Sequence, residues 1–298
     1  MRTTPLSVLL LLTLFLGAAP SKLAAATLND LGLQQVVETK TKNFGGNFGY
    51  QFEVLGRSNP FYIDGPVGKA AKASLITNKA FAVGQFGNYS FGTGAMRHNL
   101  GIVYDRTSYL PELLEVFNHD TKTVFLDNVY LHSLRWTSRA GLRGVLLANT
   151  NDGSTAYKGW SPYVSTGRLF RLSQRQHFLL GLRQSWTFSK TPDFSSIADE
   201  ESRLDHLSTS LSLDHSWRFS EAWTLRTRCG FKRSAYSTGS NHNRKDSLLN
   251  ISTSLDWAFS DYFSTSAFLA YSNRGSNQGK YAFRNLDGGL RFNASLGF

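Results

Sequence analysis

The sequence predicts an all-β protein, a transmembrane antiparallel up-and-down β-barrel of about twelve strands. The first observation is a two-residue alternation of apolar and small polar side chains, which is clearest in residues 207–219 and 286–298. A period of two is typical of strands, because successive side chains of a strand point to opposite faces. The second is that no apolar run after residue 26 approaches the ~20 residues that a spanning helix needs. The third is the regular order of short and long connections.

Residues 1–26 are interpreted as a cleaved secretory signal peptide. Arg2 provides a positive start, residues 6–16 are mostly apolar, and Ala24, Ala25 and Ala26 offer a cleavage site. An uncleaved anchor helix is the alternative, which the short apolar core disfavours. Residues 27–45 are assigned to a periplasmic N-terminal segment, because clean alternation is missing up to residue 43. The barrel domain is therefore expected to span residues 46–298.

The expected strands follow in chain order. The first begins near Phe48, and the next two contain residues 81–91 and 100–104. Residues 124–137, 142–150 and 157–170 form three more, whose facing the weak alternation leaves open. Residues 178–188 alternate clearly again. The last five strands are expected at residues 204–219, 223–236, 247–259, 263–273 and 282–298.

The connections support the count of twelve. The links after the even strands are short, at residues 92–97, 138–141, 171–176, 220–222 and 260–262. Those after the odd strands are mostly longer, including residues 56–78, 108–122, 190–203 and 237–246. Bacterial barrels have even strand numbers, short periplasmic turns and longer outer loops. Twelve strands place both termini on the short-turn side, and ten or fourteen remain alternatives.

Aromatic residues cluster at both ends of the expected strands. Trp217, Trp223 and Trp257 lie beside the short turns, whereas Trp186, Phe188, Tyr236, Tyr271, Tyr281 and Phe283 lie at the opposite ends. Two such belts are expected where a barrel crosses the two membrane–water interfaces. On these features the chain resembles the outer-membrane β-barrel class of Gram-negative bacteria, a porin-like class. That resemblance implies an outer-membrane location, contact with lipids and lipopolysaccharide, and recognition of the Phe298-terminated strand by the barrel-assembly machinery. A soluble β-sandwich is the alternative.

Composition narrows the remaining possibilities. The formal net charge is +11, and loss of Arg2 and Lys22 with the signal peptide would lower it to +9. With a secretory signal, this charge favours anionic lipopolysaccharide or anionic solutes over nucleic acid. Cys229 is the single cysteine, so an intrachain disulfide is excluded. No metal-ligand spacing and no glycine-rich phosphate loop are found, and no cofactor is expected.

The inward faces of the clearer strands carry the candidate functional residues, because a membrane barrel places its polar side chains inside. Five cations are predicted to line the pore and set selectivity: Arg183, Arg226, Arg228, Lys232 and Arg291. Asp214 and Asp256 are predicted to be their counter-charges. If Phe219 pairs with Trp223, the hairpin register places Asp214 opposite Arg228. A basic lumen would attract small polar or anionic solutes. The competing interpretation is a salt-bridged network that fills the lumen of a structural or adhesive barrel.

Two further features leave alternatives open. The helix-like residues 111–117 in an expected outer loop would either cap the barrel rim, which is favoured, or fold inward as a constriction. A lipid-modifying hydrolase would need a serine, a histidine and an orienting polar residue at the lipid face. His132 beside Ser133 and the outward His215 are candidates, but no local lipase signature accompanies them. We therefore predict no catalytic residue.

Overall fold

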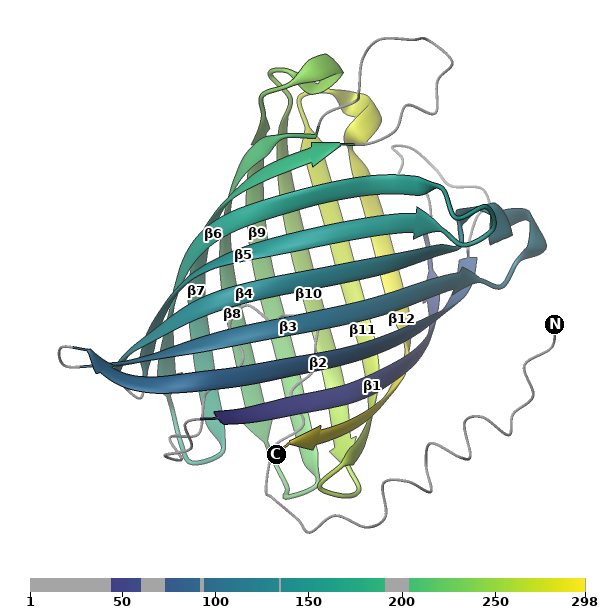
Figure 1. Ribbon diagram of the computed structural model, residues 1–298. Helices are drawn as coiled ribbons and strands as arrows, with labels where there is room; N and C mark the ends of the chain where they lie inside the picture. Colours follow the sequence, from purple (N-terminus) through teal and green to yellow (C-terminus); the bar gives the residue numbers. More distant parts are fainter. Residues whose placement is uncertain (1–43, 60–72, 92–93, 134, 191–203, 298) are drawn as a thin grey trace.

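A computed structural model describes residues 44–59, 73–91, 94–133, 135–190 and 204–297, and its strands close into one barrel (Figure 1). The predicted signal peptide, most of the N-terminal segment and Phe298 lie outside the described residues. The strands are β1 (Phe44–Arg57), β2 (Ala73–Phe91), β3 (Gly94–Tyr109), β4 (His119–Ser133), β5 (Trp136–Asn149), β6 (Thr155–Arg171), β7 (Gln176–Lys190), β8 (His206–Arg218), β9 (Trp223–Tyr236), β10 (Lys245–Ala258), β11 (Phe263–Ser276) and β12 (Phe283–Gly297).

Each strand pairs antiparallel with its neighbours in the chain, and β1 pairs with β12 to close the barrel. At this seam Phe52 lies opposite Phe292 and Glu53 lies opposite Arg291. Closure leaves no sheet edge with unpaired backbone groups, which is the condition for a sheet to span a membrane. The prediction of a twelve-stranded up-and-down barrel is confirmed.

Connection lengths alternate as predicted. Four-residue turns at 172–175, 219–222 and 259–262 join β6 to β7, β8 to β9 and β10 to β11. At the other end, two longer links contain the short 3-10 helices η3 (Glu112–Phe117) and η4 (Gly239–Asn241), and the link from β11 to β12 contains η5 (Gly279–Tyr281). We call these two ends the short-turn end and the long-loop end. Among the described residues, no helix is long and apolar enough to cross a membrane.

One predicted turn is misplaced, and another, at residues 92–97, is too long, because β3 already begins at Gly94. Residues 138–141 lie inside β5, because β4 already ends at Ser133 and β5 begins at Trp136. Ser138 pairs with Tyr130 and Gly141 with Asp127. Both faces of this hairpin carry apolar side chains, so alternation could not locate its turn. By contrast, the predicted limits of the strand at 223–236 are those of β9.

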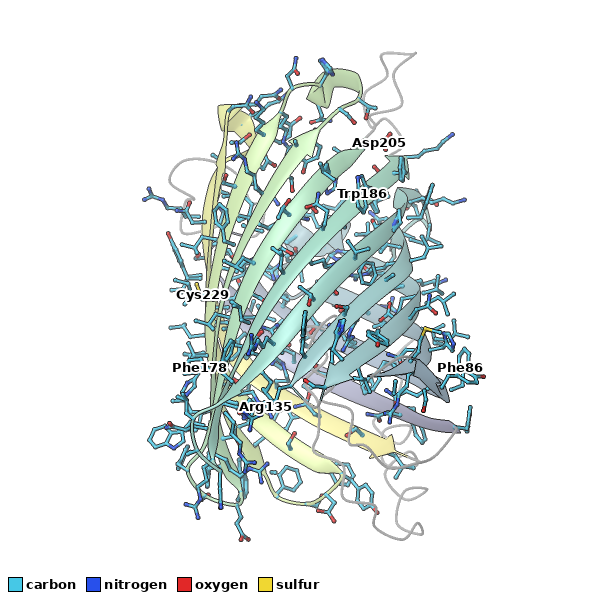
Figure 2. The ribbon with its side chains drawn as sticks, turned by 90° about the vertical axis from the view of Figure 1, so that its left-hand side faces the viewer. Phe86, Arg135, Phe178, Trp186, Asp205 and Cys229 are labelled. Carbon is cyan, nitrogen blue, oxygen red and sulfur yellow. The ribbon has the colours of Figure 1, made fainter. Side chains whose placement is uncertain are left out.

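The outer and inner faces of β7 to β9 follow the alternation in the sequence. Leu207, Leu211 and Phe231 are exposed on the outside, whereas Ser208 and Asp214 are buried on the inside. Apolar outside and polar inside is the pattern of a barrel surrounded by lipid. The lone cysteine, Cys229, is exposed on the outside of β9 (Figure 2).

The inner wall of β2 to β6 breaks that rule. Phe81, Val83 and Phe125 are buried together and pack against Val103. The side chain of Phe81 lies over Gly49, at 2.6 Å from the position of an added Cβ. The apolar residues of β2 therefore point inward as well as outward, because glycines on adjacent strands leave room for their rings.

Aromatic belts form, with a correction at the long-loop end. At the short-turn end Trp223 stacks on Trp257 with ring centres 5.8 Å apart. At the long-loop end Trp186 is exposed, as expected for a lipid-facing belt (Figure 2). Phe188 is exposed as well. The expectation is wrong for Phe283, which is 5% exposed and lies inside, in cation–π contact with Arg274.

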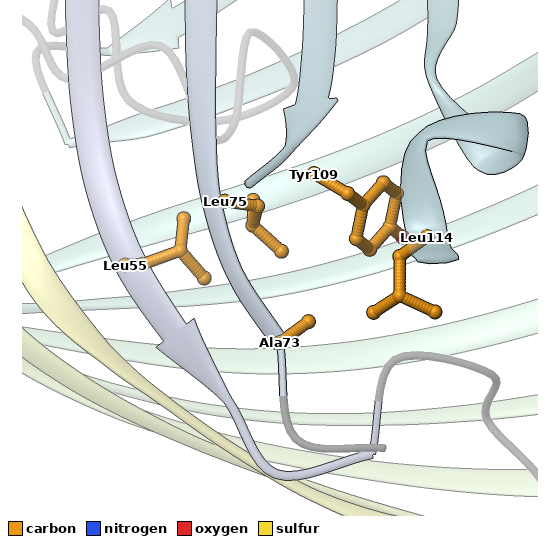
Figure 3. Close-up of a cluster of buried hydrophobic side chains, with 5 residues drawn as sticks. All are labelled: Leu55, Ala73, Leu75, Tyr109 and Leu114. Atoms are coloured by element: carbon orange, nitrogen blue, oxygen red, sulfur yellow. The ribbon is translucent and has the colours of Figure 1, made fainter. Parts of the chain in front are cut away.

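The segment predicted to be helix-like forms η3 and packs inward. Leu114 is buried against Leu55, Leu75 and Tyr109, which lie on the inner face of β1 to β3 (Figure 3). Val116 on the same segment is exposed. Leu55, Leu75 and Tyr109 lie at the long-loop ends of their strands, so η3 covers the rim there, and the apolar contacts of Leu114 draw one side of it against the inner wall.

Candidate functional site

All five predicted pore-lining cations lie on the inner face of the barrel. Arg226, Arg228 and Lys232 alternate along β9 with the outward residues Cys229 and Phe231. Arg183 lies at mid-strand on β7, and Arg291 lies on β12 beside the seam. The strand register shows that these side chains point inward, and their role in selectivity stays a prediction.

Two of these arginines are neutralised by the predicted counter-charges. The β8–β9 register places Asp214 directly opposite Arg228, as the hairpin argument predicted, and the two form an ion pair. Arg226 Nη1 lies 3.0 Å from Asp256 Oδ2 on β10. These pairs stabilise the wall and remove two charges from the net field of the lumen.

The seam holds a third pair, whose acid the sequence did not single out. Arg291 Nε donates to Glu53 Oε2 at 3.1 Å, and Gln51 donates to the same carboxylate oxygen at 3.0 Å. Arg57 contacts Asp287 through two bonds of 3.0 and 3.2 Å. Both pairs join β1 to β12, so they could be found only once the closing register was known.

Lys79 and Asp105 form another cross-strand pair, between β2 and β3, at 3.1 Å. Taken together, these contacts agree with the network interpretation for much of the lumen. Ion pairs of this kind hold side chains in place against the wall, whether or not a path remains between them.

Arg183 and Lys232 differ from the other three predicted cations, because neither forms an ion pair among the described residues. The Arg183 guanidinium lies 3.6 Å from the ring centre of Tyr163, a cation–π contact that keeps its positive charge. Lys232 makes no ion pair with any residue in the described part of the chain. In the cross-strand register Lys232 lies two strands from Arg183 on one side and two strands from Arg274 on the other. Near β7 to β11, the lumen is therefore net positive from its middle to the long-loop end.

A buried polar cluster on β4 to β6 was missed by the sequence analysis. The Tyr163 hydroxyl donates to Asp127, and Arg139 Nη1 lies 4.0 Å from the same carboxylate. The Asp127 and Arg139 side chains are almost fully buried. Weak alternation left the facing of these strands open, so no sequence signal identified Asp127 as an inward residue.

At the long-loop end, Arg244 joins two outer links. Its guanidinium donates to Asp246 at 2.5 Å and to Asn241 at 3.0 Å, and lies 3.4 Å from the ring centre of Tyr281. Tyr236 contributes a second cation–π contact at 4.3 Å. Tyr236 therefore contacts this inner cluster, which corrects its expected place in a lipid-facing belt.

One histidine–serine pair lies on the outer face. His132 Nε2 is 2.8 Å from the Ser138 hydroxyl, and the imidazole stacks on Trp136 at 4.3 Å. Among the described residues no carboxylate or amide binds the other ring nitrogen, so the orienting group of a catalytic triad is missing. Within the same residues, no group of three or more His, Cys, Asp or Glu side chains could hold a metal ion.

No protein-family model and no curated protein matches the chain in sequence. Among solved structures it is similar to an outer membrane channel from Pseudomonas putida F1, at 13% identity and a TM-score of 0.51, covering 85% of this chain and 95% of that one. The β domain of the Bordetella autotransporter BrkA matches at 15% identity and a TM-score of 0.46, covering 83% and 98%. The NanC porin matches at 10% identity and 0.43, covering 85% and 98%. The chain has the fold of outer-membrane β-barrel proteins.

Proposed function

We propose that the chain is a porin-like outer-membrane channel for passive diffusion of small polar solutes, with a preference for anions. One observation carries the preference: Arg183 and Lys232 point into the lumen, and neither forms an ion pair among the described residues. A positive charge between low-dielectric walls raises the local concentration of anions.

The paired and unpaired cations take different parts in this mechanism. Ion pairs such as Arg228–Asp214 and Arg291–Glu53 brace the wall, and Arg183 and Lys232 supply the field. Inward hydroxyls on β8, at Ser208, Ser210 and Ser212, offer hydrogen bonds that replace part of a solute's hydration. No step requires a cofactor or a catalytic group.

Reversal potentials across planar bilayers in a salt gradient test the proposal. Lys232→Gln is expected to lower the anion-to-cation permeability ratio, because it removes an unneutralised lumenal charge. Arg233→Gln is the matched control, since Arg233 is the next residue and is exposed on the opposite face of β9. Equal reversal potentials for wild type and Lys232→Gln would contradict the role of this charge. Absence of current from folded wild-type protein would overturn the channel function.

The location and the route to it are part of the proposal. Residues 1–26 would direct export, and the barrel-assembly machinery would insert the strands, with lipopolysaccharide surrounding the outer end. Membrane fractionation of cells that express the whole chain, compared with a chain lacking residues 1–26, tests the location.

A structural or adhesive barrel is the second candidate function. The inner aromatic wall at Phe81 and Phe125 and the inward packing of Leu114 favour it, because they fill part of the lumen. It predicts no ion current together with binding through the outer loops. A lipid-modifying hydrolase would instead turn over phospholipid and lose that activity in His132→Ala.

A further inference from the structure

A row of five cations crosses the barrel interior, and the sequence alone does not reveal it. When the cross-strand partners are followed from β3 to β11, every second strand contributes one cation to the same row. The members, which we call the basic row, are Arg97, Arg139, Arg183, Lys232 and Arg274. The residues between them in the register are uncharged: Val129, Ser165, Ser210 and Leu248.

The row runs the length of the barrel. Arg97 and Arg139 lie near the short-turn ends of β3 and β5, and Arg274 lies near the long-loop end of β11. Adjacent strands are about 4.8 Å apart, so successive cations are about 10 Å apart along the row. With strands tilted by about 40°, the eight steps cover about 38 Å and climb about 25 Å, the height of the apolar band.

Acidic neighbours offset the row only in part. On its long-loop side, Asp127 lies 4.0 Å from Arg139, and Asp246 lies 4.0 Å from Arg274. Asp127 also accepts from Tyr163, and Asp246 also binds Arg244. On its short-turn side, the parallel row from β6 to β10 has no charge and consists of Gly167, Gly181, Ser212, Gly230 and Asn250.

The end of the row at the short-turn side holds an unsatisfied donor. Arg97 is 7% exposed, and its Nε atom is buried without a hydrogen-bond partner. A buried guanidinium nitrogen without an acceptor is costly, and an anionic oxygen is the acceptor that suits it best. The missing acceptor does not depend on the strand register, and it points to an anion bound at the short-turn end of the row.

We propose that the basic row guides an elongated polyanion through the lumen from one end of the barrel to the other. A small anion needs one cation, whereas evenly spaced cations over the full membrane thickness match a ligand whose negative groups repeat along an extended chain. The half-buried Arg183, Lys232 and Arg274 bind one anionic group each in turn, so the chain can advance without leaving all its contacts at once. The buried Arg97 and Arg139 extend the positive field to the short-turn end, where Arg97 offers its unpaired Nε. The inference rests on the proposed channel function and specifies the class of its substrate.

Current blockade tests the proposal, with linear polyphosphate as the probe and orthophosphate as the small-anion comparison. Wild-type channels are expected to be blocked by polyphosphate at a phosphate concentration about tenfold lower than by orthophosphate, because several contacts act on one chain. Lys232→Gln should weaken the polyphosphate block about tenfold, by losing one charge-assisted contact. Lys79→Gln is the matched control: it removes the same charge from the inner face but lies outside the row.

The outcomes separate the two proposals. Equal weakening by Lys232→Gln and Lys79→Gln, or equal block by polyphosphate and orthophosphate, overturns the guiding role of the row while anion selectivity stands. Arg274→Gln, at the long-loop end of the row, is a second test variant and should also weaken the polyphosphate block. Folding of each variant is checked by its heat-dependent mobility on gels. A wild type without current or without anion preference overturns the channel function itself, and the guiding role with it.

Discussion

At the residue scale, three inward aromatic rings of the β1 to β6 wall lie over glycines of the adjacent strand. Phe81 covers Gly49, Phe125 covers Gly101, and Tyr163 covers Gly141. A Cβ at Gly49 would meet the Phe81 ring and the Ala294 carbonyl oxygen, both at 2.6 Å. These glycines are required by the close approach of a ring.

This packing predicts unequal effects of two alanine substitutions on the inner face. Gly49→Ala should destabilise the barrel by about 1–3 kcal/mol, because the ring and the carbonyl cannot both move away from the methyl group. Gly230→Ala should be close to neutral, since the nearest atom to its Cβ is at 4.0 Å. Urea unfolding in lipid vesicles measures both. A Gly49→Ala barrel as stable as Gly230→Ala would refute the packing argument.

At the element scale, the buried side chain of Arg244 contacts the links after both β9 and β11, which the Asn277 side chain also joins through a bond of 2.9 Å to Asn243 O. Arg244 is 3% exposed and contacts both Asp246 and Tyr281. Burial alone would lower the pKa of the Arg244 guanidinium, but its hydrogen bonds to Asp246 raise that pKa above its ordinary value. The guanidinium therefore stays charged, and its bonds to Asp246 last for as long as that carboxylate is ionised.

Arg244→Gln should loosen both links without opening the barrel. Removing the guanidinium deletes its bonds to Asp246 and Asn241, and the buried Asp246 loses most of its compensation. Hydrogen exchange of residues 237–244 and 277–282 should accelerate about tenfold or more, whereas that of β9 should not change. Lys280→Gln is the control, because Lys280 contacts the same Tyr281 ring at 5.0 Å but has an exposed side chain. Unchanged exchange in Arg244→Gln would remove Arg244 from this role.

At the scale of the whole molecule, the closed barrel depends on the pairing of its first and last strands. The β1–β12 seam carries Arg291–Glu53 and Arg57–Asp287 inside and Phe52 opposite Phe292 outside. Without that pairing, both strands would expose unpaired backbone groups to lipid, which costs several kcal/mol for each group.

A disulfide across the seam tests closure and register together. In a Cys229→Ser background, cysteines at Phe52 and Phe292 should form a disulfide on oxidation, since directly opposite residues lie within disulfide reach. Cysteines at Phe52 and Leu286 are offset by six residues, about 20 Å, and should not. Non-reducing gels of heated samples report the cross-link. A cross-link in the offset pair alone would show another register.

The difference between the two halves of the barrel explains how far prediction could reach. In β7 to β12 the inner face is rich in serine and charge, so alternation located the strands, the Asp214–Arg228 pair and the candidate cations. In β2 to β6 both faces carry apolar residues, so the β4–β5 turn was misplaced and the inward Phe81, Phe125 and Asp127 were not identified. Phe283 was assigned to the wrong face because an aromatic residue at a strand end can contact either lipid or an inner arginine.

The sequence by itself determined the fold class, the strand number, the short-turn end and the inward face of the C-terminal half. Each of these follows from local alternation and the lengths of the links, which neighbouring residues specify. Tertiary structure alone decided which acids neutralise which cations, which wall fills with rings, and that five cations on alternate strands share one row. Those relations depend on the register between strands and on closure of β1 with β12, and register is a property of the pairing that no single strand contains.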